Sequence, residues 1–196
     1  MEERILDTAD RLFYSQGVRT VGVDTIAAEI GISKRTLYNH FASKDALIVA
    51  YLARRVRPPV VSDEPPVVQI CGFFERLERG FARSTFHGCP FVNAVAELKE
   101  PGHAANRIAF DFKEQRRAWF RDLLCRANAT DPDRLSLQLV MLVDGAIAAA
   151  LVRRDPTVAI AALDAARVLL GAAEVKAAID PTPNRRGARA RRTSKR

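Results

Sequence analysis

The most informative part of the chain is the run VDTIAAEIGISKRTLYNHF, residues 23–41. Apolar residues recur at helical intervals in both halves of this run, and Gly31 stands between the halves. A tight connection between two helices favours glycine, which adopts positive φ without strain, and the small Ala27 lets the helices cross closely. Ser33 occupies the N-cap position of the second helix. The run therefore predicts a helix-turn-helix over 22–44. The apolar surface expected to fix the crossing consists of Ile26, Ile30, Ile32, Leu37 and Phe41.

The second helix of such a unit can enter the major groove of DNA, and its outward side chains here are all polar. Between Ser33 and Lys44 the charge is +3, with no acidic residue. Because long donors and amides can read base edges, the predicted base contacts are Lys34, Arg35, Thr36 and Asn39. The predicted phosphate contacts are Tyr38, His40 and Lys44. Each residue alone could be a solvated charge or a packing residue, so the prediction rests on the whole set.

The net charge of +8 does not locate this unit, although a basic chain suggests a nucleic-acid partner. Residues 180–196 hold seven basic residues and one acidic residue, so this tail carries +6. Residues 1–50 hold six basic and seven acidic residues, which gives −1. The DNA-binding prediction therefore depends on the local pattern and not on the composition of the chain.

The rest of the chain also reads as helical, because apolar residues recur every three or four positions without a strand-like alternation. The predicted helices are 2–16, 23–30, 34–41, 44–57, 67–84, 91–99, 103–127, 132–153 and 156–178. Residues 58–66 contain four prolines and two acidic residues, which is typical of a loop. We predict an all-α fold of about nine helices. Its parts are an N-terminal three-helix helix-turn-helix domain at 1–50, a second helical domain at 51–179 and a basic, disordered tail at 180–196.

The sequence does not indicate a disulfide-bonded protein, a metalloprotein or an enzyme. Cys71, Cys89 and Cys125 lack paired spacing, so we expect reduced thiols. His87 and Cys89 are close in sequence, but His103 and Cys125 fall on other predicted helices, so we expect no metal site and no cofactor. The histidines have no nucleophile or carboxylate at a suggestive spacing, and no phosphate-binding glycine loop occurs, so an enzyme is not expected.

A membrane protein is not expected either. The longest apolar stretch, 139–152, contains Asp144 and is too short to cross a bilayer. The charged start Met1-Glu2-Glu3-Arg4 is not followed by the apolar segment of a signal peptide. The sequence therefore predicts a cytoplasmic protein.

Four segments of the chain resemble the N-terminal domain of TetR/AcrR-family regulators. They are FYSQG at 13–17, IA at 26–27, GIS at 31–33 and LYNHFASKDAL at 37–47. The resemblance implies that Tyr38, His40 and Lys44 contact the DNA backbone. It also implies that Lys34, Arg35 and Thr36 read bases. The chain departs from the family pattern at Val21-Gly22, where hydroxyl residues are common, and at Arg35, where glycine is common. Arg35 thus adds a candidate direct contact.

The resemblance also implies a helical regulatory domain at 51–179 whose last two long helices form a four-helix dimer interface. Segments 132–153 and 156–178 favour a homodimer, because both carry wide apolar surfaces with many small residues. The alternative is that they bury these surfaces within one monomer. The segment GCPFVNAVAE at 88–97 resembles the start of a sixth helix that, in one subgroup, lies between the ligand pocket and the DNA-binding domain.

A small-molecule pocket is lined by aromatic side chains with a few polar anchors. The predicted lining is Phe74, Phe91, Asn93, Phe110, Trp119 and Met141, with Phe81 as a further candidate. Aromatic residues at helical spacing are also common packing residues, so an ordinary core is the alternative. The sequence shows no acidic cluster that would select a cation and no basic cluster that would select an anion.

Taken together, these features predict a transcriptional repressor that leaves a palindromic operator when a small-molecule effector binds. The expected partners are double-stranded DNA, the effector and a second copy of the chain. The alternative is a non-inducible accessory or architectural DNA-binding protein, whose basic tail adds sequence-independent affinity.

Overall fold

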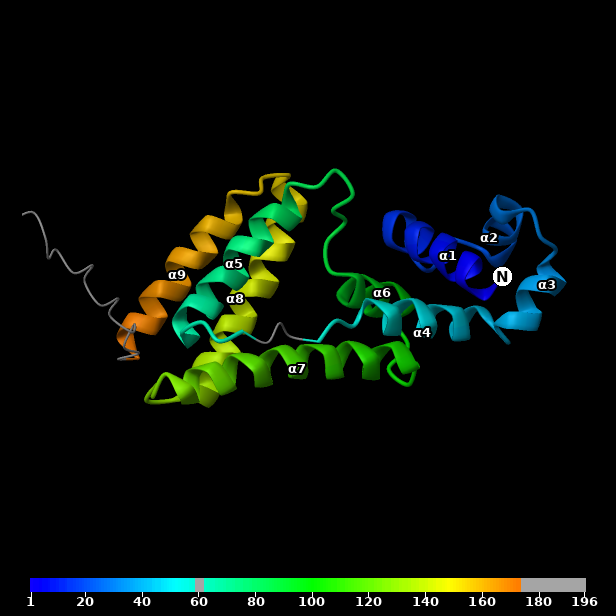
Figure 1. Ribbon diagram of the computed structural model, residues 1–196. Helices are drawn as coiled ribbons and strands as arrows, with labels where there is room; N and C mark the ends of the chain where they lie inside the picture. The colour runs from blue at the N-terminus through cyan, green and yellow to red at the C-terminus, as the bar shows by residue number, and fades with distance from the viewer. Residues whose placement is uncertain (59–61, 174–196) are drawn as a thin grey trace, which may run out of the picture.

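The computed structural model describes residues 1–58 and 62–173, and within them it contains nine helices and no strand (Figure 1). The first four helices are α1 (Glu2–Gln16), α2 (Val23–Ile30), α3 (Lys34–His40) and α4 (Lys44–Arg55). The next five are α5 (Pro66–Phe81), α6 (Pro90–Leu98), α7 (Ala104–Arg126), α8 (Pro132–Arg153) and α9 (Val158–Ala172). The predicted all-α fold is confirmed.

Polar caps explain where several helices begin. The Oγ atom of Ser33 accepts a hydrogen bond from Thr36 N at 3.0 Å, and Ser43 caps α4 through Ala46 N at the same distance. The last helix begins two residues later than predicted, because the Asp155 carboxylate accepts from both the N–H and the hydroxyl of Thr157 and holds a turn there. Its predicted end at 178 and the predicted tail at 180–196 lie outside the described residues.

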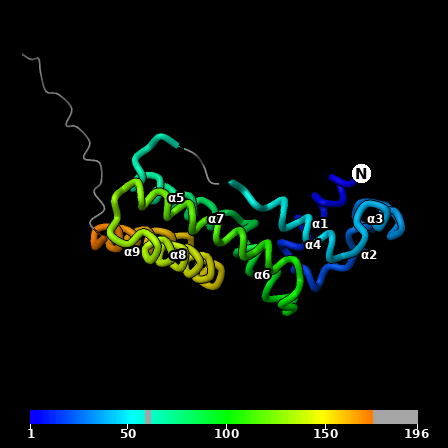
Figure 2. The backbone as a smooth tube through the Cα atoms, turned by 90° about the horizontal axis from the view of Figure 1, so that it is seen from below, coloured from blue at the N-terminus to red at the C-terminus, as the bar shows by residue number. Residues whose placement is uncertain are grey.

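The residues of each of the two hydrophobic clusters do not form one continuous part of the chain. The first cluster joins α1–α4 to Phe91 and Ala94 of α6 and to Ala105 at the start of α7. The second cluster joins α5, α8 and α9 to the later part of α7, around Leu123 and Leu124. Figure 1 shows α7 running along the lower side of the molecule, from below α8 to below α6 and α4, and Figure 2 shows the same helix from below. Helix α7 therefore connects the two clusters.

Helix α8 is, among the described residues, the one helix long and apolar enough to span a membrane. The apolar stretch 139–152 is too short to cross a bilayer, as predicted, but the whole of α8, Pro132–Arg153, is long enough. In the fold, α8 packs against α5, α7 and α9. Its Asp144 forms an ion pair with Lys113 of α7.

Candidate DNA-binding surface and adjoining pocket

The helix-turn-helix consists of α2 and α3, with α1 packed against α2. Gly31 has a φ of 72°, the left-handed conformation that the connection was predicted to require. Its N–H donates to Ala28 O at 3.1 Å and ends α2. Ala27 and Leu37 are buried where the helices cross. The predicted geometry of this unit is confirmed.

The polar side chains of α3 lie on the face opposite buried Leu37. The exposed ones are Lys34, Arg35, Tyr38, Asn39 and His40, and the half-buried ones are Thr36 and, at the start of α4, Lys44. Figure 1 places α3 at the end of the molecule farthest from α9. The surface is thus accessible to a groove of DNA, and the individual contacts stay predictions.

Two lysines on this surface already have partners within the chain. The Lys34 ammonium donates to the Asp24 carboxylate at 3.0 Å, and this hydrogen bond raises the pKa of Lys34. The Lys44 ammonium donates to Arg19 O at 3.3 Å, while burial lowers its pKa, with Asp45 acting in the opposite direction. Asp24 lies on α2, outside the acid-free run 33–44, which is why the local sequence pattern did not include it.

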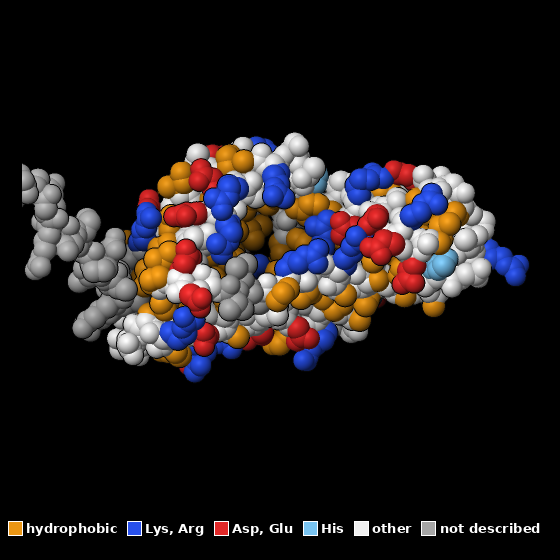
Figure 3. Space-filling model, in the orientation of Figure 1, with side chains coloured by type: hydrophobic (Ala, Val, Ile, Leu, Met, Phe, Trp, Pro, Cys, Tyr) orange, Lys and Arg blue, Asp and Glu red, His pale blue; other side chains and the backbone are white. Residues whose placement is uncertain are grey.

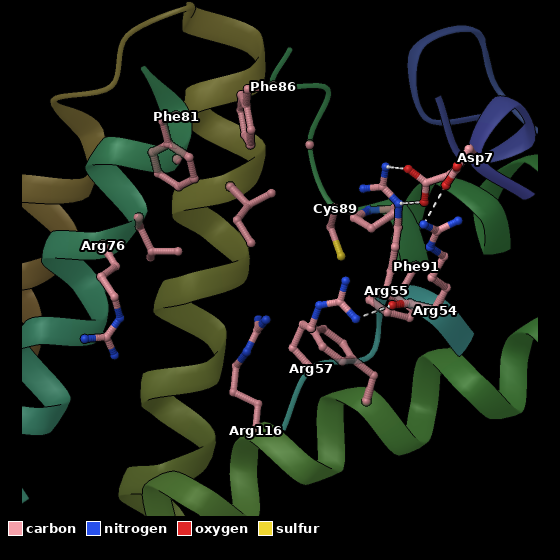
Figure 4. Close-up of a pocket in the computed structure, with 17 residues that line it drawn as sticks. Asp7, Arg54, Arg55, Arg57, Arg76, Phe81, Phe86, Cys89, Phe91 and Arg116 are labelled. Atoms are coloured by element: carbon pink, nitrogen blue, oxygen red, sulfur yellow. Dashed lines mark hydrogen bonds and ion pairs between the residues drawn. The ribbon is translucent and has the colours of Figure 1, made fainter. Parts of the chain in front are cut away.

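A pocket of about 560 Å³ lies between the helix-turn-helix domain and the other helices. Its walls come from α1, α4, α5, α7, α8 and the segment that begins α6 (Figure 4). Figure 3 shows a hollow between the two ends of the molecule, with apolar side chains at its floor and Lys or Arg side chains at its rim. The pocket is therefore positioned to be altered by any movement of the DNA-binding domain.

The predicted pocket residues do not come together. Phe91, with Phe81, lines this pocket, and Trp119 lines a smaller neighbouring one. Phe74 is fully buried in the second hydrophobic cluster. The amide of Asn93 donates to His87 O at 2.8 Å and lines none of the described pockets. Phe110 and Met141 are 59% and 65% exposed, because they lie on the outer faces of α7 and α8.

Basic side chains gather at one place in the fold, although the sequence showed no basic cluster that would select an anion. Five arginines from four elements line the larger pocket: Arg54 and Arg55 of α4, Arg57 of the following loop, Arg76 of α5 and Arg116 of α7 (Figure 4). The sequence brings only the first three near one another. Tertiary packing adds the other two, so no local motif could reveal the cluster.

Both ends of α6 contact the DNA-binding domain. At its start, the Tyr14 hydroxyl donates to Gly88 O at 2.9 Å and lies 3.1 Å from His87 N, which donates to it. At its end, the Glu97 carboxylate accepts from Arg19 N at 2.9 Å. Gly17, with φ 96°, lies so close that an added Cβ would be 2.6 Å from Glu97 Oε2. Helix α6 is thus fixed to α1 and to the loop after it.

Comparison with known proteins assigns this architecture to a family. Residues 5–51 match the model of bacterial regulatory proteins of the tetR family. A TetR-family transcriptional regulator from Streptomyces coelicolor is 34% identical, with a TM-score of 0.81, over 87% of this chain and 94% of that one. A structure from Streptomyces avermitilis is 35% identical, with a TM-score of 0.80, over 89% and 98% of the two chains.

Curated relatives match over different lengths. An HTH-type transcriptional regulator from Mycobacterium tuberculosis is 44% identical over 55 residues, which span 28% of this chain and 27% of that protein. The regulator YjdC from Escherichia coli is 21% identical over 161 residues, or 78% of this chain and 84% of that protein. Together with the structural match over 87% of this chain, these findings show that the chain belongs to the TetR family of transcriptional regulators and binds DNA through its helix-turn-helix.

Proposed function

We propose that this chain is a cytoplasmic, homodimeric repressor that leaves a palindromic operator when a small molecule occupies the pocket. The supporting observation is the position of the pocket, whose walls include Asp7 and Asp10 of α1 as well as residues of α5 and α7. A ligand there contacts both the DNA-binding domain and the helices behind it. It therefore favours whichever relative arrangement gives it better contacts.

Helix α6 supplies the mechanical link in this proposal. It forms one end of the pocket through Cys89 and Phe91 and holds the DNA-binding domain through Gly88 and Glu97. A shift of α6 on ligand binding moves Tyr14 and Arg19 with it, because both are hydrogen-bonded to it or to the loop before it. The two recognition helices of a dimer then no longer match two half-sites.

A stripe on α8 supports the homodimer. Exposed apolar or small residues recur on one face at Leu137, Met141, Gly145, Ala148 and Val152. On α9, Ile160 and Val168 are 45% and 71% exposed. Apolar side chains flanked by small residues let a helix approach closely, and α8 and α9 pack against each other, so the stripes can form a two-fold interface.

The DNA-binding part is tested by selecting duplexes from a random pool with the full chain. The expected result is a two-fold palindrome with half-sites about one helical turn or more apart. Diffuse binding without a consensus would instead support the alternative of an accessory or architectural protein, which the charge of +6 in residues 180–196 favours.

The sensing part is tested on the selected duplex by fluorescence anisotropy. Acidic, basic and neutral amphiphiles are added to the complex in turn, and at least one class is expected to lower the anisotropy. If no class changes operator affinity, the regulator is not ligand-responsive through this pocket.

The dimer is tested by light scattering after size-exclusion chromatography. Met141→Asp places a charge in the α8 stripe and is expected to yield monomers. Val68→Asp, at a 48% exposed apolar site on α5, is the matched control and should leave the mass unchanged. A dimer that tolerates Met141→Asp as well as Val68→Asp would place the interface elsewhere.

A further inference from the structure

The charges around the larger pocket do not cancel. Arg54 pairs with Asp7 at 2.6 Å, and Arg55 binds both carboxylate oxygens of Asp10 at 2.7 Å, so these two arginines are neutralised (Figure 4). Arg76 and Arg57 form no ion pair within the described residues. They project from two separate elements that face the same space. The pocket therefore carries an excess of positive charge.

Arg116 is the most unusual member of the cluster. Its side chain is 14% exposed, and its Nη1 atom has no hydrogen-bond partner within the described residues. The nearest carboxylate, Asp144, is 3.7 Å away and is already paired with Lys113. A buried donor without an acceptor is costly, and arginine stays charged even though burial lowers the pKa of Arg116. An acceptor supplied by a ligand would remove this cost.

Aromatic side chains adjoin the positive cluster. The Arg116 guanidinium lies 4.8 Å from the ring centre of Phe112. A second cavity of about 250 Å³ shares Arg57, Arg76 and Arg116 with the first and adds Phe73 and Trp119. The larger cavity, of about 560 Å³, has a size that suits small organic molecules. The space formed by these two adjoining cavities, which share lining residues, thus offers a positive part and an aromatic part.

We propose that this space binds an organic anion, with its acidic group held by Arg57, Arg76 and Arg116 and its apolar body placed against Phe112, Phe73 and Trp119. The inference rests on the proposed function, since it names the chemical class of the effector. Guanidinium groups suit carboxylates and other oxyanions because they present paired donors. A cationic ligand has no free carboxylate in this space, because Asp7 and Asp10 are already paired.

Two dyes with the same ring system test the charge requirement. The full chain is titrated with 8-anilinonaphthalene-1-sulfonate and with N-phenyl-1-naphthylamine, which lacks the sulfonate, and fluorescence is recorded. The sulfonate dye is expected to bind one site per chain at least tenfold more tightly. Equal affinity for both dyes would overturn the proposal, because it would show that only apolar surface is recognised.

Variants locate that binding. Arg116→Met should weaken the sulfonate dye at least tenfold and leave the neutral dye within twofold, whereas Arg116→Lys should retain part of the difference. Arg107→Met, at an exposed site on the same helix, is the matched control and should change neither dye. If Arg116→Met does not fold by circular dichroism, Arg57→Gln/Arg76→Gln carries the test, since both side chains are exposed. Unchanged sulfonate binding in every folded variant would overturn the proposal.

Operator binding is measured on the same samples. If the chain binds its palindrome normally but binds the sulfonate and neutral dyes with equal affinity, the anion site alone is refuted. Charge-dependent dye binding without any sequence-specific DNA binding would refute the proposed function and leave the anion site standing.

Discussion

The recognition surface and the arginine pocket are built in opposite ways. The recognition surface comes from one run of sequence, 33–44, and its polar residues face solvent by helical periodicity alone. The pocket draws its arginines from α4, the next loop, α5 and α7, so residues as far apart in the sequence as Arg54 and Arg116 line one cavity. A contiguous site can be read from a sequence, whereas a composite site exists only after packing.

The largest effect is expected from a substitution in the core that holds the recognition helix α3 in place. Leu37→Ala removes a fully buried side chain at the crossing of α2 and α3. It should lower the free energy of unfolding by about 2–5 kcal/mol, measured by urea denaturation. Val68→Ala, at a 48% exposed site on α5, is the control and should cost less than about 1 kcal/mol. Similar losses for both would mean that the crossing is not well packed.

The joint between the two regions is tested at Gly17. Gly17→Ala places a side chain at φ 96° and 2.6 Å from Glu97 Oε2, so it should cost about 1–3 kcal/mol of stability. The double variant Gly17→Ala/Glu97→Ala removes the steric conflict but not the backbone strain. Thermal unfolding should therefore show partial recovery. Full recovery of stability would indicate that the backbone conformation at Gly17 carries no strain. If no stability is recovered, the contact with α6 is unimportant.

The recognition surface alone is tested at Arg35. Arg35→Ala should weaken binding to the selected palindrome by about 1–3 kcal/mol and relax the preference at one base pair per half-site. The sulfonate dye should bind this variant as it binds the parent chain, because Arg35 does not line the pocket. Arg107→Ala is the control for loss of one exposed arginine. An unchanged base preference in a repeated selection would contradict the role of Arg35.

The smallest effect is expected at Asp24. Asp24→Asn removes the carboxylate that holds Lys34 at 3.0 Å, so it should strengthen DNA binding about two- to fivefold at low salt. The gain should fade as ionic strength rises, since exposed charges are screened. Asp111→Asn on α7 is the matched control. Weaker binding of Asp24→Asn would show that this ion pair positions Lys34 for DNA.

The sequence predicted the parts of the molecule that depend on neighbours along the chain. The helices could be predicted from Gly31, Ser33 and the periodicity of each segment, because caps and amphipathic faces depend on residues close in the sequence. The pocket was predicted poorly for a physical reason. An aromatic residue at helical spacing can face the core, as Phe74 does, or the outside, as Phe110 does, and only the neighbouring helix decides.

Charge was the least predictable property of the pocket. Arg54 and Arg55 are followed closely by Arg57, and this group reads as an ordinary solvated helix end. Whether Arg54 and Arg55 are neutralised depends on carboxylates of α1, more than 40 residues earlier. Arg116, whose Nη1 atom has no hydrogen-bond partner within the described residues, lies on another helix again. Net charge in a cavity is therefore a property of the tertiary fold.

The length of α7 has a mechanical consequence. The helix has 23 residues, so it is a rod of about 35 Å with Ala105 held in one cluster, Leu124 in the other and Arg116 in its later half. A rod of that length that tilts by about 5° about its far end displaces its near end by about 3 Å. In the proposed homodimer each rod would contribute its own displacement, so the distance between the two α3 helices would change by about twice that amount. A tilt of α7 by a few degrees can therefore change the distance between the two α3 helices by more than the length of a hydrogen bond.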